Sequence, residues 1–180
     1  LRGRVRLCRA QLDVARRYND STYRKSLNEL DLLTSKAVFR EVLTKIDTYF
    51  YTNPDWKDLI KNGFWQLQLA LQNDQFRGFH KLQVNNERDA AFKQSIDHWL
   101  IRQDIRNYQD VLHAVEYISR QANQTYLLPH QATILEMMAG SISLLDRYSS
   151  YLTGSELDDM FSQINGNFVG LGVELRILDK

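Results

Sequence analysis

The sequence predicts a mainly α-helical protein, a multi-helix bundle that changes character near its C-terminus. Apolar residues recur at i, i+3/i+4 and i+7 spacing through most of the first 153 residues. Glycine is sparse in this region, and the only two prolines, Pro54 and Pro129, fall between apolar stripes. From residue 166 onward, three of the eight glycines precede Val173, Leu175 and Ile177, an alternation that is typical of a loop followed by a β-strand.

The first two apolar stripes predict a pair of helices with separate caps. Thr34 or Ser35 can cap the first helix, because a hydroxyl accepts a hydrogen bond from a free N–H of the first turn. The second is expected after Asn53-Pro54, with asparagine as the cap and proline at the first helical position, where its missing N–H costs nothing. The stripes are Val38, Phe39, Val42, Leu43, Ile46, Tyr49 and Phe50, then Trp56, Leu59, Ile60, Phe64, Leu67 and Leu71.

Three further stripes and one short segment complete the expected helices. A short helix is expected to run from Ser155 to Ile164, because Ser155 and Asp158 have the spacing of a capping box with Asp in place of Glu. The stripes are Phe92, Ile96, Trp99 and Leu100, then Tyr108, Val111, Leu112, Val115 and Ile118, and after Pro129, Ile134, Leu135, Met138, Ile142 and Leu145.

The helical region contains a weak internal echo. Val42-Leu43-x-x-Ile46, Pro54, Gly63 and Leu67 are followed later by Val111-Leu112-x-x-Val115, Pro129, Gly140 and Leu144. Each half would form a helix, a turn marked by proline and a second helix. The pattern is consistent with two helical-hairpin repeats, but the spacing differs between the halves, which favours chance similarity between helical hairpins.

Composition excludes several classes of protein. With 43% hydrophobic and 25% charged residues among 180, and no apolar run of about 18 residues, the chain has no integral membrane segment. The net charge of +1 argues against nucleic-acid binding, and the single cysteine, Cys8, excludes an internal disulfide. An N-terminal run of basic residues is interpreted as the solvated face of a helix, with contact to an anionic membrane surface as the alternative. These are Arg2, Arg4, Arg6, Arg9, Arg16 and Arg17.

No catalytic residue, metal site or cofactor site is predicted in this chain. The four histidines share no metal-ligand spacing. His113 and Glu116 are expected to form a surface pair on one helix, and Asp97 and His98 diverge because neighbours on a helix point about 100° apart. Asp146 and Ser149 are expected to cap a turn. Ser141 follows a glycine but no strand, so it is not a nucleophile elbow.

Two motifs near the C-terminus resemble a known family. The first is Leu145-Asp146-Arg147-Tyr148-Ser149-Ser150-Tyr151-Leu152-Thr153, and the second is Gly166-Asn167-Phe168-Val169-Gly170-Leu171-Gly172-Val173. In this order and spacing they resemble the junction between the N-terminal helical region and the PDZ domain of carboxyl-terminal processing peptidases (tail-specific proteases). One departure is Arg147, which stands where that family usually has proline.

The resemblance implies three segments. Residues 1–153 would be the helical domain, 154–165 a connecting short helix, and 166–180 the start of a PDZ domain cut inside its fold, because a lone strand cannot satisfy its backbone groups. In the intact protein, the backbone N–H groups of one loop would receive the C-terminal carboxylate of a protein substrate. That loop consists of Phe168, Val169, Gly170, Leu171 and Gly172.

The resemblance also implies a function for the parent protein. Members of this family are serine endopeptidases whose serine nucleophile and lysine base lie beyond the PDZ domain, so this chain itself is expected to be inactive. The helical region would scaffold, form a homodimer or gate access, and the protein would be exported to the bacterial periplasm. The alternative is a stand-alone helical module for protein–protein interaction with a Gly-rich linker. The apolar, strand-like pattern from Phe168 to Ile177 disfavours a linker.

Overall fold

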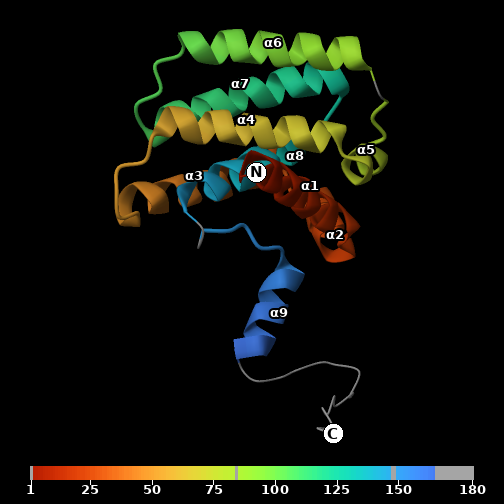
Figure 1. The fold of residues 1–180 in the computed structure, drawn as a ribbon, viewed down its shortest axis with the longest axis vertical. Coiled ribbons are helices and arrows are strands. Elements are labelled where there is room, and N and C mark those ends of the chain that lie inside the picture. The colour runs from red at the N-terminus through yellow and green to blue at the C-terminus, as the bar shows by residue number, and fades with distance from the viewer. Residues whose placement is uncertain (1, 84, 147–148, 165–180) are drawn as a thin grey trace, which may run out of the picture.

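The computed structural model describes residues 2–83, 85–146 and 149–164, and within them it contains only helices (Figure 1). This confirms the predicted mainly α fold. The helices are α1 (Arg2–Asn19), α2 (Ser21–Glu29), α3 (Leu32–Tyr49), α4 (Trp56–Gln72), α5 (Asp74–His80), α6 (Asn86–Arg102), α7 (Tyr108–Tyr126), α8 (His130–Leu145) and α9 (Gly154–Ile164). The expected loop and strand after residue 166, and the PDZ prediction that depends on them, lie outside the described residues.

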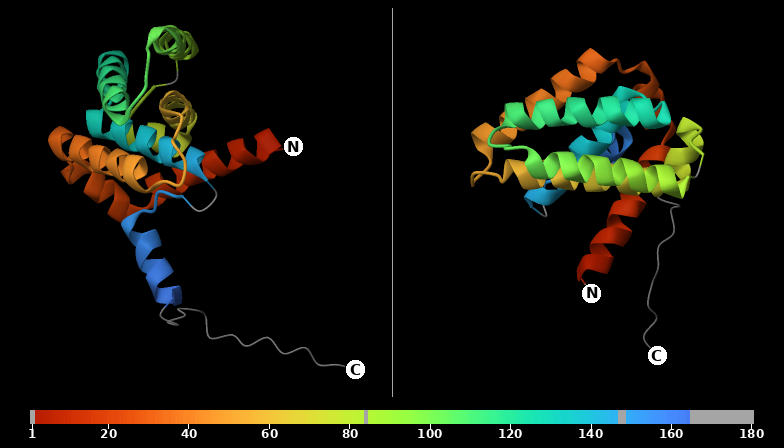
Figure 2. Two further views of the ribbon diagram at one scale, coloured as in Figure 1. Left: turned by 90° about the vertical axis from the view of Figure 1, so that its left-hand side faces the viewer. Right: turned by 90° about the horizontal axis from the view of Figure 1, so that it is seen from above.

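Helix α8 is the centre of the bundle. Every residue from Ala132 to Ser141 is buried, as is typical of a helix that is covered on all sides. It packs against α4, α7 and α3, while α6 packs on α7 to form an outer layer (Figures 1 and 2). Helix α1 contacts α2, α4 and α5.

Two glycines allow α4 and α8 to cross at backbone contact. A Cβ atom on Gly140 would lie 2.5 Å from Gln66 Cβ and 2.9 Å from Gly63 Cα. A Cβ atom on Gly63 would lie 2.7 Å from Met137 O. These separations are too short for non-bonded atoms, so only glycine fits at this crossing.

The crossing is closed by side-chain hydrogen bonds from one helix to the backbone of the other. Ser141 Oγ lies 3.0 Å from Leu59 O, and Asn62 Nδ2 donates to Gly140 O at 2.5 Å. Gly63 and Gly140 are also the glycines of the two halves that echo each other in the sequence. Two helical-hairpin repeats stay a prediction, but the matching positions lie in direct contact.

The predicted apolar stripes supply most of the core. All six residues of the second stripe, from Trp56 to Leu71, are buried. In the first stripe Phe39 and Leu43 are buried, whereas Val38 and Tyr49 at its margins are exposed.

The predicted cap residues are wrong at three helices. Asp31 caps α3, because its Oδ1 accepts a hydrogen bond from Thr34 N at 2.6 Å. Asp55 caps α4 in place of Asn53, and its Oδ1 accepts from Asp58 N at 2.9 Å, so Pro54 lies before the helix. Aspartate is among the strongest N-caps, and its negative charge also suits the helix N-terminus. The third correction, at α9, belongs to the site described below.

Replacing Gly140 with alanine tests the crossing. We expect Gly140→Ala to lower the free energy of unfolding by about 3 kcal/mol, because the added Cβ forces α4 and α8 apart. Urea denaturation measures this change. Gly78→Ala is the matched control, since no atom lies within 4 Å of the Cβ position at Gly78, and it should be neutral or stabilise by up to about 1 kcal/mol. Equal effects of the two substitutions would contradict the close crossing.

Candidate functional site

The segment that follows α8 is the candidate site, because it carries the first of the two family-like motifs. Its described residues are Asp146 and 149–153, which lie between the bundle and α9 (Figure 1). Asp146 Oδ1 accepts a hydrogen bond from Ser149 N at 2.7 Å. The predicted capping role of Asp146 is therefore confirmed, and Ser149 takes part through its backbone N–H. We call this segment the junction strap.

A capping box joins the junction strap to α9. Glu156 Oε2 accepts from Thr153 N at 2.8 Å, and Thr153 Oγ1 accepts from Glu156 N at 3.3 Å. The box was predicted at Ser155 and Asp158, so its position was wrong by two residues. Glutamate reaches back to the backbone N–H of the cap more readily than the shorter aspartate, which explains the choice of Thr153 and Glu156.

Ser155 instead ties α9 to the start of α2. Its hydroxyl donates a hydrogen bond to Asp20 Oδ2. The other oxygen of Asp20 accepts from Thr22 N at 2.8 Å and from Tyr23 N at 3.2 Å, which caps α2. The hydrogen bond from Ser155, followed by those from the backbone, lowers the pKa of Asp20. The base of α9 is therefore held by an ionised carboxylate.

A cleft of about 450 Å³ separates the junction strap from α1. We call it the junction cleft; its lining residues are Arg9, Asp13, Arg16, Arg17, Ser143, Asp146, Ser149, Ser150, Tyr151, Leu152 and Glu156. Burial raises the pKa of Asp13, and the charges of Arg17, Arg16 and Arg9 only partly offset this. The cleft thus presents basic residues from α1 opposite polar groups of the strap.

A buried ion pair lies behind the cleft. Arg17 Nη2 lies 2.6 Å from Glu136 Oε2, and Arg17 Nε donates to Oε1 at 3.3 Å, which makes the contact bidentate. The side chains of Arg17 and Glu136 are only 7% and 0% exposed. Burial is the largest single influence and would lower the pKa of Arg17, but the charge and hydrogen bond of Glu136, together with Tyr23 and Tyr18, outweigh it and raise that pKa. Sequence reasoning placed Arg17 on a solvated helix face, and this is wrong.

A sequence signal for this pair exists in each helix. Arg17 follows Ala10 and Val14 at helical spacing on the inner face of α1, and Glu136 interrupts an otherwise apolar run in α8. Neither signal identifies the partner, because the two residues are 119 positions apart.

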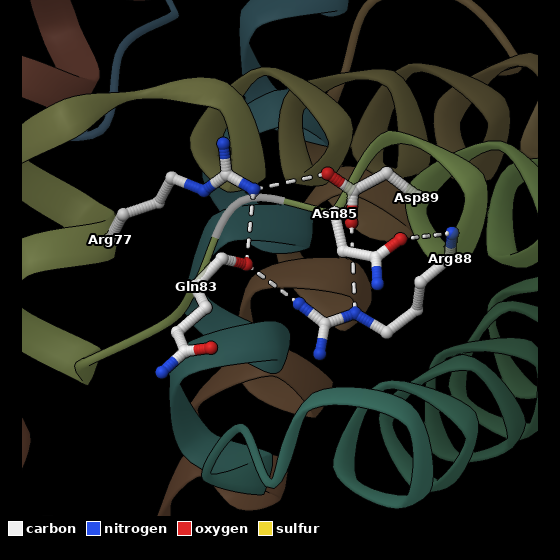
Figure 3. Close-up of polar contacts among 5 residues, drawn as sticks. All are labelled: Arg77, Gln83, Asn85, Arg88 and Asp89. Atoms are coloured by element: carbon white, nitrogen blue, oxygen red, sulfur yellow. Dashed lines mark hydrogen bonds and ion pairs between the residues drawn. The ribbon is translucent and has the colours of Figure 1, made fainter.

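A second polar cluster anchors the loop between α5 and α6 (Figure 3). Arg77 Nη2 lies 3.1 Å from Asp89 Oδ2, and Arg88 Nη2 donates to Gln83 O at 2.7 Å. Asn85 Oδ1 accepts from Arg88 N at 2.9 Å and caps α6. The Arg88 guanidinium also lies 4.8 Å from the ring centroid of Tyr126. These contacts fix the loop, and they bring no nucleophile to a base.

The other residues weighed in the sequence have structural roles. Glu116 pairs with Lys36 of α3, not with His113, although both line one surface hollow. Asp97 pairs with Lys93. Ser141 is buried and hydrogen-bonded to carbonyl oxygens.

The described residues form neither a metal site nor a membrane-spanning helix. In residues 2–83, 85–146 and 149–164, no group of His, Cys, Asp or Glu side chains is arranged to hold a metal ion. No helix in those ranges combines the length and apolar character needed to span a membrane. The predicted carboxylate loop, Phe168 to Gly172, lies outside the described residues.

Comparison with protein-family models, curated protein sequences and solved structures finds no match for this chain.

The buried ion pair predicts an asymmetric response to substitution. Glu136→Gln should lower the free energy of unfolding by about 3–5 kcal/mol, because it leaves the guanidinium of Arg17 buried without a counter-charge. The double variant Arg17→Met/Glu136→Leu should recover most of that loss, since it buries no charge. Urea denaturation of both variants measures the difference. A loss below about 1 kcal/mol for Glu136→Gln would show that Arg17 escapes to solvent.

His80 predicts a pH dependence of stability. Its ring lies among Tyr18, Phe76 and Phe79, and burial lowers its pKa from 6.5 to about 4. The unfolded chain therefore binds a proton at higher pH than the folded chain, so stability falls as the pH drops from about 6.5 to about 4, by up to about 3 kcal/mol.

The His80→Phe variant isolates this contribution. Its unfolding free energy should depend less on pH than that of the wild type across this window. His98→Gln is the control, because His98 is exposed, and it should follow the wild-type profile. Identical profiles for wild type and His80→Phe would place the His80 ring in solvent.

Proposed function

We propose that this chain is the non-catalytic helical N-terminal region of a carboxyl-terminal processing (tail-specific) serine endopeptidase of the bacterial periplasm. Its role there is to hold the start of a PDZ domain that binds substrate C-termini. The observation that carries the proposal is the junction strap. Residues that match the family motif, Asp146, Ser149 and Thr153, make the hydrogen bonds that connect the bundle to α9.

The structure of the strap favours a scaffold over a flexible tether. Both of its ends are closed by side-chain hydrogen bonds, and Ser155 fastens the base of α9 to Asp20. A flexible linker needs no such anchors. In the proposed parent, α9 therefore leads the chain from a fixed point on the bundle into the carboxylate loop at Phe168 to Gly172.

The chemistry of the described residues is consistent with a non-catalytic role. Among them, Ser141 is fully buried, and its hydroxyl is committed to the α4–α8 crossing. Hydrolysis would belong to a serine and a lysine downstream of the PDZ domain, as in the family that the motifs resemble. The bundle would contribute orientation, homodimer formation or gating.

One observation favours a second candidate, a helical module for protein–protein interaction. Apolar side chains on α1 and α9 are exposed, including Val5 and Phe161. This role does not require a peptidase, and it is compatible with one.

A peptide-cleavage assay on the longer gene product tests the peptidase proposal. We expect the protein that continues through the PDZ and catalytic regions to hydrolyse a peptide with a free, apolar C-terminus. Amidation of that C-terminus should lower kcat/KM by at least about tenfold, because a neutral amide loses the charge-assisted hydrogen bonds of the carboxylate loop.

The 180-residue chain alone is the control and should show no turnover. Cleavage by this chain that is lost on replacing one of its own serines would overturn the proposal. So would a reading frame without a PDZ domain after Lys180, in which case the interaction module becomes the better conclusion.

A further inference from the structure

Helix α9 presents an acidic, amphipathic surface that no other described element covers. Leu157, Met160 and Phe161 are exposed, the last by 51%. Their spacing of three and four residues places them on one side of the helix. All charged residues of α9 are acidic: Glu156, Asp158 and Asp159.

Helix α1 presents a surface of the same kind with the opposite charge. Val5 and Leu12 are 61% and 51% exposed, and the exposed Cys8 lies between them. This stripe flanks a shallow hollow of about 550 Å³, lined by Arg4, Val5, Cys8, Arg9, Leu12, Asp13 and Arg16. The side chains of Arg4, Arg9 and Arg16 make no hydrogen bond or close ion pair with other described residues, although the charges of Arg9 and Arg16 act on Asp13.

The side of α1 that carries Val5, Cys8 and Leu12 is called its outer face. We propose that this outer face binds α9 of a second copy of this chain, and that two such contacts, related by a two-fold axis, form a homodimer. The inference rests on the homodimer role included in the proposed function and specifies its surfaces. It does not depend on the peptidase assignment.

Charge selects this pairing over the symmetric ones. A contact between two copies of α1 would bring Arg4, Arg9 and Arg16 against the same arginines, and a contact between two copies of α9 would bring carboxylates together. Both arrangements are repulsive, whereas α1 against α9 of the partner pairs opposite charges beside two apolar stripes.

The shape of the molecule allows the contact to be reciprocal. The N-terminal half of α1 and the whole of α9 project from the bundle in different directions (Figures 1 and 2). Arg9, Asp13 and Arg16 line both the hollow on α1 and the junction cleft, which reaches Glu156 at the base of α9. The outer face of α1 and the base of α9 therefore form one continuous surface, and a two-fold axis places two such surfaces face to face.

Binding to a membrane surface explains the exposed apolar and charged residues of α1 and α9 less well than dimerisation does. An anionic lipid surface would attract the arginines of α1. It would also repel Asp158 and Asp159 and leave the apolar side of α9 uncovered. A second copy accounts for both helices at once.

Charge reversal tests the pairing in the 180-residue chain. Sedimentation equilibrium should give twice the 21.2 kDa mass of one chain at high concentration. Arg4→Glu/Arg9→Glu and Asp158→Arg/Asp159→Arg should each weaken dimerisation by at least about tenfold, and the combined variant should restore it, because the opposite charges face each other again. The control Asp47→Arg/Glu87→Arg, on α3 and α6, changes the net charge by the same amount and sign as Asp158→Arg/Asp159→Arg and should have no effect on dimerisation.

Disulfide trapping tests the geometry, because Cys8 is the only cysteine in the chain. Under mild oxidation the Met160→Cys variant should form covalent dimers. The wild type and Cys8→Ser/Met160→Cys should not, since they report α1–α1 and α9–α9 contacts respectively. Circular dichroism confirms that each variant is folded.

Several results would overturn the inference. A monomer at every concentration would do so, including one that binds anionic vesicles. A dimer that is indifferent to both charge reversals, or an intramolecular disulfide in Met160→Cys, would also do so. None of these results bears on peptide cleavage by the longer gene product, so the two proposals fail separately.

Discussion

The backbone contact between α4 and α8 is the constraint on which the rest of the bundle depends. With glycine on both sides, the two helices approach until a carbonyl oxygen of each lies 2.7–2.8 Å from the position of a Cβ atom on the other, which is too close for a side chain. Hydrogen bonds from Ser141 to Leu59 O and from Asn62 to Gly140 O then fix the register, because they suit only one sliding position of the helices. Helices α3 and α7 pack against this pair, and α6 packs on α7.

The Arg17–Glu136 ion pair fixes α1 to the α4–α8 pair, because Glu136 lies on α8. A buried ion pair adds little net free energy compared with apolar packing, but displacing one partner strands a charge in a dry environment. We infer that the pair holds α1 in a single orientation on the bundle. Arg6 supports this orientation from the other end, because its guanidinium donates to Asn62 Oδ1 and lies 4.7 Å from the ring centroid of Trp65. Asn62 thus connects α1 to the α4–α8 crossing.

The parts of this structure that could be predicted from sequence are those that depend on local pattern. The periodic spacing of apolar residues predicts those helices between α3 and α8 that carry clear stripes. The short polar pattern of the strap predicts the turn at Asp146. Cap positions were wrong because several capping residues lie within a few positions of each other and only geometry selects among them. The contacts of Arg17 with Glu136 and of Gly63 with Gly140 could not be predicted, because they join segments that only the tertiary fold brings together.

The junction between the bundle and α9 combines two features: a hydrogen-bonded connection and exposed apolar side chains. Asp146 and Thr153 at the two ends of the strap make hydrogen bonds within the chain, as a fixed connection between a bundle and a following segment requires. The apolar sides of α1 and α9 are exposed among the residues that the structure describes, although exposed apolar stripes favour association. A segment that served only as a spacer would gain nothing from a capping box, an anchor at Asp20 and an apolar side. Because the base of α9 and residues of α1 line the same junction cleft, a partner that covers one of these helices also constrains the direction in which the chain leaves the bundle.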